Sequence, residues 1–253
     1  GHIQSQSPTC LIPCVNTPLL GYTIEFLIYN NISQLTIFAY EHKKAISDFL
    51  DSHNFYGIDI RLVRCSERPS VTSVIRELDG EDLIKGDFLL VNGHVITNID
   101  ISKAIEEHNK RKAQDVPMLM TKLFIKNSFE SKRRSPQDLV TIVTNSETKE
   151  MYKYESMHNK TKSVLNKHFE FSQKKHASLD VAMSLIDCDI DIISHQSIVG
   201  ILEDFSNFDQ FKDEFINHVT ESEIIVDKVY FHEVEGIDYF CRVTNPQVYF
   251  QAC

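Results

Sequence analysis

Three aspartates spaced two residues apart, Asp187, Asp189 and Asp191, are the residues of this sequence best suited to hold a metal ion. Carboxylate oxygens are the ligands that Mg²⁺ prefers, and Asp189-Ile190-Asp191 has the D-x-D spacing of metal-dependent glycosyltransferases. Such a motif must lie at the end of a strand, facing a cleft, whereas this triplet lies inside the apolar run from residue 185 to residue 193. Alternation along a strand places the three aspartates on one face, which predicts an ordinary half-buried strand rather than a metal site.

A histidine, His94, is the second candidate, because it follows a glycine and a nearly continuous apolar run at residues 87–92. It could belong to a metal or pH-sensing site, or it could be a polar residue that lines a reduced crevice at the carboxyl end of a strand. The second interpretation is favoured, because no other His or Cys stands at ligand spacing. No G-x-S-x-G motif occurs, and no cysteine has a recognisable catalytic context.

The remaining composition excludes several classes of protein. The 253 residues are 42% hydrophobic and 25% charged, which is enough for one large domain with a core. The formal net charge of -10 argues against nucleic acid as the main partner. The one basic cluster, Lys132-Arg133-Arg134, is interpreted as a solvated loop. No apolar stretch is long enough to span a membrane.

The six cysteines are scattered without a C-x-x-C pair, which is typical of reduced thiols in a cytosolic protein. We therefore expect a cytoplasmic protein without disulfides. Four phenylalanines near the carboxyl end have partly helical spacing, and we interpret them as core residues rather than a ligand-binding box. They are Phe205, Phe208, Phe211 and Phe215.

The first half of the sequence alternates helix and strand signals. Alternation of this kind predicts right-handed βαβ units and a sheet with helices on both faces. The apolar run at residues 87–92 is typical of a parallel strand buried on both faces. Helices are predicted at residues 18–27, 43–50, 71–78 and 101–112, with Asp100 as the N-cap of the last, and strands at residues 35–40, 58–63 and 87–92.

The second half has longer strands and fewer helices. An amphipathic helix is predicted at residues 209–219, and a late hairpin is predicted from the strands at residues 224–233 and 239–243. The polar segments 126–136 and 156–178 are predicted to be loops. Further strands are predicted at residues 118–125, 139–144 and 185–193.

Three segments resemble the nucleotidyltransferase domain of sugar-nucleotide pyrophosphorylases. Residues 8–22, PTCLIPCVNTPLLGY, resemble the P-K-P-L-x-P-V-x-N-x-P-[ML]-I-x-Y block of that family. Residues 88–95, FLLVNGHV, resemble its strand that ends in G-D, and residues 242–249, RVTNPQVY, resemble its D-[IV]-G-T-P-x-x-Y block. The resemblance implies an α/β fold: a mixed, mostly parallel sheet flanked by helices in a Rossmann-like three-layer sandwich.

Two further segments resemble the epsilon subunit of eukaryotic translation initiation factor 2B. Residues 98–108, NIDISKAIEEH, are similar to its N-I-N-I-[ST]-x-A-[LI]-E-E-H block, and residues 185–192, LIDCDIDI, to its L-[LI]-D-C-x-I-x-I block. The five blocks stand in the family's order and span residues 8–253. The resemblance implies one amino-terminal nucleotidyltransferase-like domain over 1–253. The family's first strand and glycine-rich loop are expected to be missing before Pro8. Its β-helix and carboxyl-terminal exchange domain are expected to lie outside the sequence.

The charged positions of an active nucleotidyltransferase are replaced in this sequence. The lysine of P-K-P corresponds to Thr9, the G-D aspartate after Gly93 to His94, and the aspartate of D-[IV]-G-T-P to Arg242. An active enzyme needs Lys, Arg and Mg²⁺ to neutralise phosphate charge during transfer. These replacements predict a degenerate pocket without catalytic residues, cofactor or metal, and hence a pseudoenzyme domain.

The resemblance implies a function in assembly and regulation of the guanine-nucleotide exchange factor for translation initiation factor 2. The expected partners are the other subunits of that complex, especially gamma, and the initiation factor itself through the full-length protein. The alternatives are an active nucleotidyltransferase that joins a sugar phosphate to a nucleoside triphosphate, or a nucleotide-binding domain without turnover.

Overall fold

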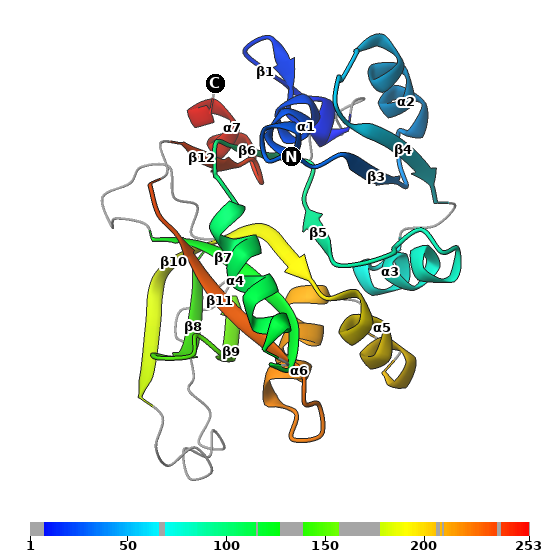
Figure 1. The fold of residues 1–253 in the computed structure, drawn as a ribbon. Helices are drawn as coiled ribbons and strands as arrows, with labels where there is room; N and C mark the ends of the chain where they lie inside the picture. The colour runs from blue at the N-terminus through cyan, green and yellow to red at the C-terminus, as the bar shows by residue number, and fades with distance from the viewer. Residues whose placement is uncertain are drawn as a thin grey trace. The chain divides into compact units, whose positions relative to one another are not determined.

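The computed structural model describes residues 8–65, 69–114, 116–126, 139–156, 178–205, 208, 210–236 and 239–252. The chain divides into two compact units (Figure 1). Unit 1 comprises Gly1–Pro69, Val91–Ser102 and Gly236–Cys253, and unit 2 comprises Ser70–Leu90 and Lys103–Glu235. The expectation of one domain over residues 1–253 stays a prediction.

Unit 1 begins with a short turn, a tight hairpin and a βαβ unit. The apolar helix α1 starts directly after Pro18, as the sequence predicted. Strands β3 and β4 are parallel, with Gln34 opposite Asp59, and α2 connects them. The elements are η1 (Thr9–Leu11), β1 (Pro13–Cys14), β2 (Thr17–Pro18), α1 (Leu19–Tyr29), β3 (Gln34–Ala39), α2 (Lys43–Ser52) and β4 (Asp59–Arg64).

Helix α1 contributes to two apolar clusters of unit 1. Leu19 packs with residues of the late segment, including Val243 and Val248, whereas Leu20 and Ile24 pack against the β3–α2–β4 segment. The late segment consists of β6 (Val95–Thr97), β12 (Phe240–Arg242) and α7 (Pro246–Ala252), with β6 and β12 antiparallel. The unit therefore joins chain segments that are more than a hundred residues apart in the sequence.

Unit 2 is built on a mixed sheet with the strand order β11-β7-β10-β8-β9, and β5 also pairs with β10. Strand β11 is parallel to β7, whereas the β7–β10, β10–β8 and β8–β9 pairs are antiparallel. The fold class is thus α/β with a mixed sheet, as predicted, although antiparallel pairs outnumber parallel ones in this sheet. The strands are β5 (Phe88–Val91), β7 (Met118–Lys126), β8 (Leu139–Asn145), β9 (Met151–Ser156), β10 (Leu179–Ile193) and β11 (Lys228–Val234).

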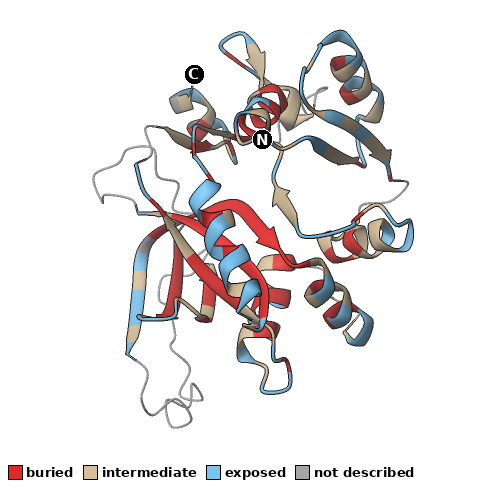
Figure 2. Ribbon diagram, in the orientation of Figure 1, coloured by how far each residue is buried: buried red, intermediate tan, exposed pale blue. Residues whose placement is uncertain are grey.

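The helices of unit 2 pack on this sheet. Figure 2 shows the buried residues concentrated on its strands, while one side of α4 is exposed. The predicted amphipathic segment at residues 209–219 forms a π-helical turn, η3 (Phe211–Ile216), and then α6 (Asn217–Glu221). Its apolar residues Phe211, Phe215 and Val219 are buried, as expected. The other helices are α3 (Val71–Gly80), α4 (Ser102–Ala113) and α5 (His195–Asp204).

Two expectations about strands are wrong. The predicted late hairpin does not form, because β11 pairs with β7 and β12 pairs with β6. Each of these two strands instead pairs with a strand from an earlier part of the chain. Strand β5 is only half-buried along its length, whereas burial on both faces was predicted. It ends at Val91, as expected.

Other expectations fall outside the described residues. They include most of the two predicted loops, 126–136 and 156–178, and the basic cluster at residues 132–134. Within the part of the chain that the structure describes, no helix is both long and apolar enough to cross a membrane.

Candidate functional site

All four predicted pocket positions lie in unit 1. Thr9 is exposed and opens the turn η1. A Cβ atom added to Gly93 would lie 3.9 Å from the Cβ atom of Cys10 and 3.6 Å from Cδ1 of Leu20. The turn η1, which lies within the first sequence block, is therefore beside the connection between β5 and β6.

His94 directly precedes β6, and Arg242 lies on the neighbouring strand β12. Arg242 lies opposite Val95 in the β6–β12 pair, and the backbone N–H of Val243 donates to the carbonyl oxygen of His94 at 3.0 Å. The strand pair is well anchored, because Val95 is fully buried and its carbonyl accepts the hydroxyl of Thr23 at 3.0 Å. The structure thus brings together two positions that the sequence separates by almost 150 residues.

The donor groups at these positions do not fit a magnesium–nucleotide centre. Mg²⁺ prefers carboxylate oxygens, whereas the side chains here are a hydroxyl at Thr9, an imidazole at His94 and a guanidinium at Arg242. A guanidinium is always charged in proteins and cannot act as a metal ligand. Among the described residues, no group of three or more His, Cys, Asp and Glu side chains is arranged to hold a metal ion. No catalytic step through a metal is therefore derived for this pocket.

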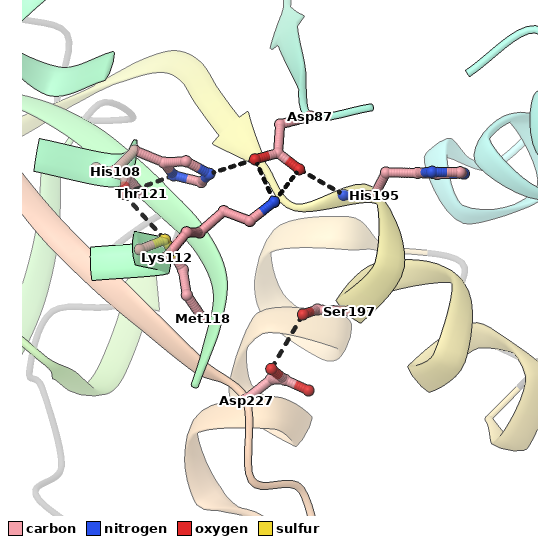
Figure 3. Close-up of polar contacts among 8 residues, drawn as sticks. All are labelled: Asp87, His108, Lys112, Met118, Thr121, His195, Ser197 and Asp227. Carbon is pink, nitrogen blue, oxygen red and sulfur yellow. Dashed lines mark hydrogen bonds and ion pairs between the residues drawn. The ribbon is translucent and has the colours of Figure 1, made fainter. Parts of the chain in front are cut away.

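A second polar site surrounds Asp87, the residue before β5, in unit 2 (Figure 3). Its carboxylate accepts hydrogen bonds from Nζ of Lys112 at 2.7 and 2.8 Å, from Nε2 of His108 at 3.3 Å and from the backbone N–H of His195 at 3.3 Å. Burial raises the pKa of the Asp87 carboxyl, but the hydrogen bond and charge of Lys112, with the amide of His195, outweigh it and hold the pKa below its usual value.

His108 lies fully buried between Asp87 and Thr121. Burial lowers the pKa of its imidazole more than the charge of Asp87 raises it, so His108 is neutral at pH 7. A neutral imidazole has one donor and one acceptor. Since Asp87 requires a donor at Nε2, Nδ1 accepts the hydroxyl of Thr121 at 3.0 Å. The contact of that hydroxyl with the sulfur of Met118, at 4.0 Å, is then a packing contact.

The hydrogen-bonded series Asp87–His108–Thr121 has the order of residues of a catalytic triad, but a substrate cannot reach it. Thr121 is completely buried, so no substrate can reach its hydroxyl. The series also begins at the amino end of a strand, whereas open α/β sheets bind ligands beyond the carboxyl ends. We conclude that this cluster holds elements together.

The carboxylate of Asp87 also caps helix α5. The N-cap residue Ser194 makes no side-chain cap, and the N–H of His195 donates to Asp87 instead. A negative charge at a helix N-terminus satisfies an unpaired donor and interacts favourably with the helix dipole. His195 also contacts Asp79 of α3 at 2.6 Å through Nε2. The sequence reasoning missed this site, because its residues come from four separate segments.

The three aspartates of β10 form a third site, and the prediction for them is wrong in part. Asp187, Asp189 and Asp191 are all buried, so the strand is not half-exposed. Nζ of Lys122 lies 2.8 Å from Oδ1 of Asp191 and 3.1 Å from Oδ2 of Asp187. Lys212 forms ion pairs with Asp187 and Asp189. Lysines therefore supply the cations of this cluster. Ile190 and Ile192 are buried, as expected.

Comparisons with known proteins agree with this description. No family model matches the chain. It is 29% identical over 250 residues to "Translation initiation factor eIF2B subunit epsilon" of Dictyostelium discoideum, covering 98% of this chain and 35% of that protein. It is 28% identical over 246 residues to the protein of the same name from Schizosaccharomyces pombe, covering 96% of this chain and 36% of that protein. The chain thus spans about a third of the length of these relatives.

Solved structures with low sequence identity share the fold. They include HddC from Yersinia pseudotuberculosis, with a TM-score of 0.65 at 14% identity, covering 98% of this chain and 90% of that one. Apo UDP-glucose pyrophosphorylase gives a TM-score of 0.62 at 12% identity, covering 97% of this chain and 88% of that one. The shared fold and the similarity to these relatives agree with the resemblance predicted from the five sequence blocks. The chain is therefore similar over nearly its whole length to eIF2B epsilon subunits, and it shares the α/β fold of these nucleotidyltransferase-like structures.

Proposed function

We propose that this chain is a non-catalytic domain that serves assembly and regulation of the guanine-nucleotide exchange factor for translation initiation factor 2. The observation that carries the proposal is the position of His94, directly before β6, next to Arg242 of β12, which pairs with Val95. A nucleotidyltransferase needs oxygen ligands for Mg²⁺ and a lysine for the phosphates at these positions. An imidazole, a guanidinium and the uncharged Thr9 supply neither.

The proposal includes the domain organisation and the partners. The two compact units are proposed to form one nucleotidyltransferase-like domain, because the chain passes between them repeatedly and neither unit is one continuous segment. The exchange reaction is assigned to parts of the full-length protein outside this chain. The proposed partners are the other subunits of the complex, especially gamma, and through the full-length protein the initiation factor itself. The proposed location is the cytoplasm.

Isothermal titration calorimetry tests the absence of nucleotide chemistry. The protein would be titrated with Mg²⁺ and GTP, UTP or dTTP, and pyrophosphate release would be followed with glucose 1-phosphate present. We expect neither binding heat nor pyrophosphate. Binding without pyrophosphate would favour a nucleotide-binding domain without turnover, and pyrophosphate formation would overturn the pseudoenzyme assignment.

A co-purification experiment tests the assembly function. The domain would be mixed with the gamma subunit and analysed by size-exclusion chromatography with light scattering, and nucleotide exchange on the initiation factor would be measured in parallel. We expect complex formation without exchange. Exchange by the domain alone would contradict the proposal, and so would the lack of any association with the other subunits.

A further inference from the structure

The first residues of β10, Leu179–Met183, lie at an open edge of the unit 2 sheet. On one side they pair with β8, with Val181 opposite Val143. On the other side, β7 pairs with β10 only from Leu185 onward. Within the described part of the chain, no strand therefore pairs with this second side of Leu179–Met183. Figure 2 shows that much of this end of β10 is exposed.

The open edge presents backbone hydrogen-bonding groups. The N–H of Ser146 donates to the carbonyl oxygen of Ser178, directly before β10, at 2.9 Å. Backbone groups alternate in direction along an antiparallel strand, so those of Asp180 also point toward β8. The N–H and C=O groups of Leu179 and Val181 then point away from β8, to the open side. An edge of this kind can accept a further strand.

The side chains along this edge are mostly apolar, and two of them are exposed. Val181 is 53% exposed and Met183 is 55% exposed. The one charged residue of the segment is Asp180, whose carboxylate lies 3.9 Å from Nζ of Lys149. Edge strands of soluble proteins usually carry Lys, Pro or a bulge that prevents pairing with another chain. The segment Leu179–Met183 has neither Lys nor Pro, so its edge is suited to bind another strand.

We propose that this edge pairs with the same edge of a second copy of the chain, antiparallel about a two-fold axis at Val181. In this register Val181 lies opposite Val181 of the second copy, and Leu179 lies opposite its Met183. Asp180 lies opposite Ala182 of the second copy, so no like charges face each other directly. The segment is thus complementary to itself, which favours a second copy over an unrelated strand. A short edge buries little area, so the dimer is weak and forms at high concentration.

Sedimentation equilibrium at hundreds of micromolar tests this pairing. The parent protein carries Phe250→Ser, so that the exposed aromatic side chain of unit 1 does not contribute. Val181→Lys and Val181→Glu each place two like charges across the two-fold axis, and either charge is solvated in the monomer because residue 181 is exposed. We expect each variant to dimerise about tenfold more weakly than the parent. The matched control is Val226→Lys, because Val226 is 65% exposed and lies outside β10, and it should dimerise as the parent does.

A mixture of the two variants tests the register. When Val181→Lys and Val181→Glu are mixed in equal amounts, the ammonium of one lies opposite the carboxylate of the other. We expect the mixture to dimerise within about threefold of the parent. The proposal is refuted if the parent stays monomeric, if both single variants dimerise as the parent does, or if Val226→Lys weakens the dimer equally. A mixture that dimerises no better than its two components also refutes the pairing at Val181.

Discussion

The buried carboxylate of Asp191 should make the stability of this protein depend on pH in an unusual direction. Burial raises the pKa of Asp191 to about 6, although the charge of Lys122 opposes that shift. In an unfolded chain an Asp titrates near 3.9. Between these two values the folded state holds a proton that the unfolded state has lost. The free energy of unfolding therefore falls as the pH rises through this window, because the folded state binds more protons.

The size of the effect follows from the two pKa values. One pKa unit corresponds to about 1.4 kcal/mol, so the difference between a pKa of about 6 in the folded state and about 3.9 in the unfolded state makes ionised Asp191 destabilise the fold by about 3 kcal/mol above pH 6. Below the unfolded pKa the cost vanishes. The lowered pKa of Asp87 opposes this trend, and the comparison between the wild type and the Asp191→Asn variant isolates the contribution of Asp191.

Urea unfolding followed by circular dichroism, at pH values from 4.5 to 7.5, measures the effect without tryptophan, which the sequence lacks. Asp191→Asn keeps the volume and removes the ionisation. We expect the difference in unfolding free energy between the variant and the wild type to shift by about 2 kcal/mol in favour of the variant as the pH rises. A difference that is the same at pH 4.5 and pH 7.5 would refute the reasoning, whatever the absolute stability of the variant.

Three further outcomes are expected. Asp87→Asn should lower the free energy of unfolding, measured by thermal unfolding, by about 1–2 kcal/mol, because it weakens the cap of α5 and the ion pair with Lys112. The exposed control Asp82→Asn should change the free energy of unfolding by less than about 0.5 kcal/mol. Phe250 is 77% exposed and should contribute to self-association at high concentration. Phe250→Ser should therefore lower the mass measured by light scattering. A wild-type protein that is strictly monomeric at hundreds of micromolar would contradict this expectation. The pair His94→Asp and Arg242→Asp should introduce Mg²⁺ binding detectable by calorimetry, and its failure would show that residue type alone does not explain the pocket.

Local periodicity predicted the elements of the first half well. Helix α1 and the β3–α2–β4 unit formed within one or two residues of the predicted bounds, because proline placement and apolar spacing act on neighbouring residues. The same reasoning failed for β11 and β12. Their apolar patterns identified two strands, but strand patterns do not specify a partner, and each strand pairs with one from an earlier part of the chain.

The candidate positions in unit 1 came from the sequence blocks rather than from local chemistry. Thr9 and Arg242 attract no notice by type or spacing, and only the resemblance to nucleotidyltransferases singled them out, whereas His94 also stands out as a histidine after the apolar run at residues 87–92. The structure then places Arg242 beside the residue after His94. In contrast, the Asp87 site had no sequence signal beyond the position of His108 on the buried face of α4, four residues after Ala104.

The three aspartates of β10 show why a motif can be misinterpreted in two ways, because the register between β10 and β7 shifts between Asp187 and Asp191. Interpreted as D-x-D, Asp189 and Asp191 suggest a metal site, and interpreted as alternating residues they suggest a half-buried strand with the aspartates on its polar face. Neither interpretation includes the lysines, because Lys122 and Lys212 are distant in the sequence. Once two ammoniums lie among three carboxylates, burial of the aspartates no longer requires a metal ion. The contacts of Asp87 and of the β10 aspartates thus hold elements of unit 2 together.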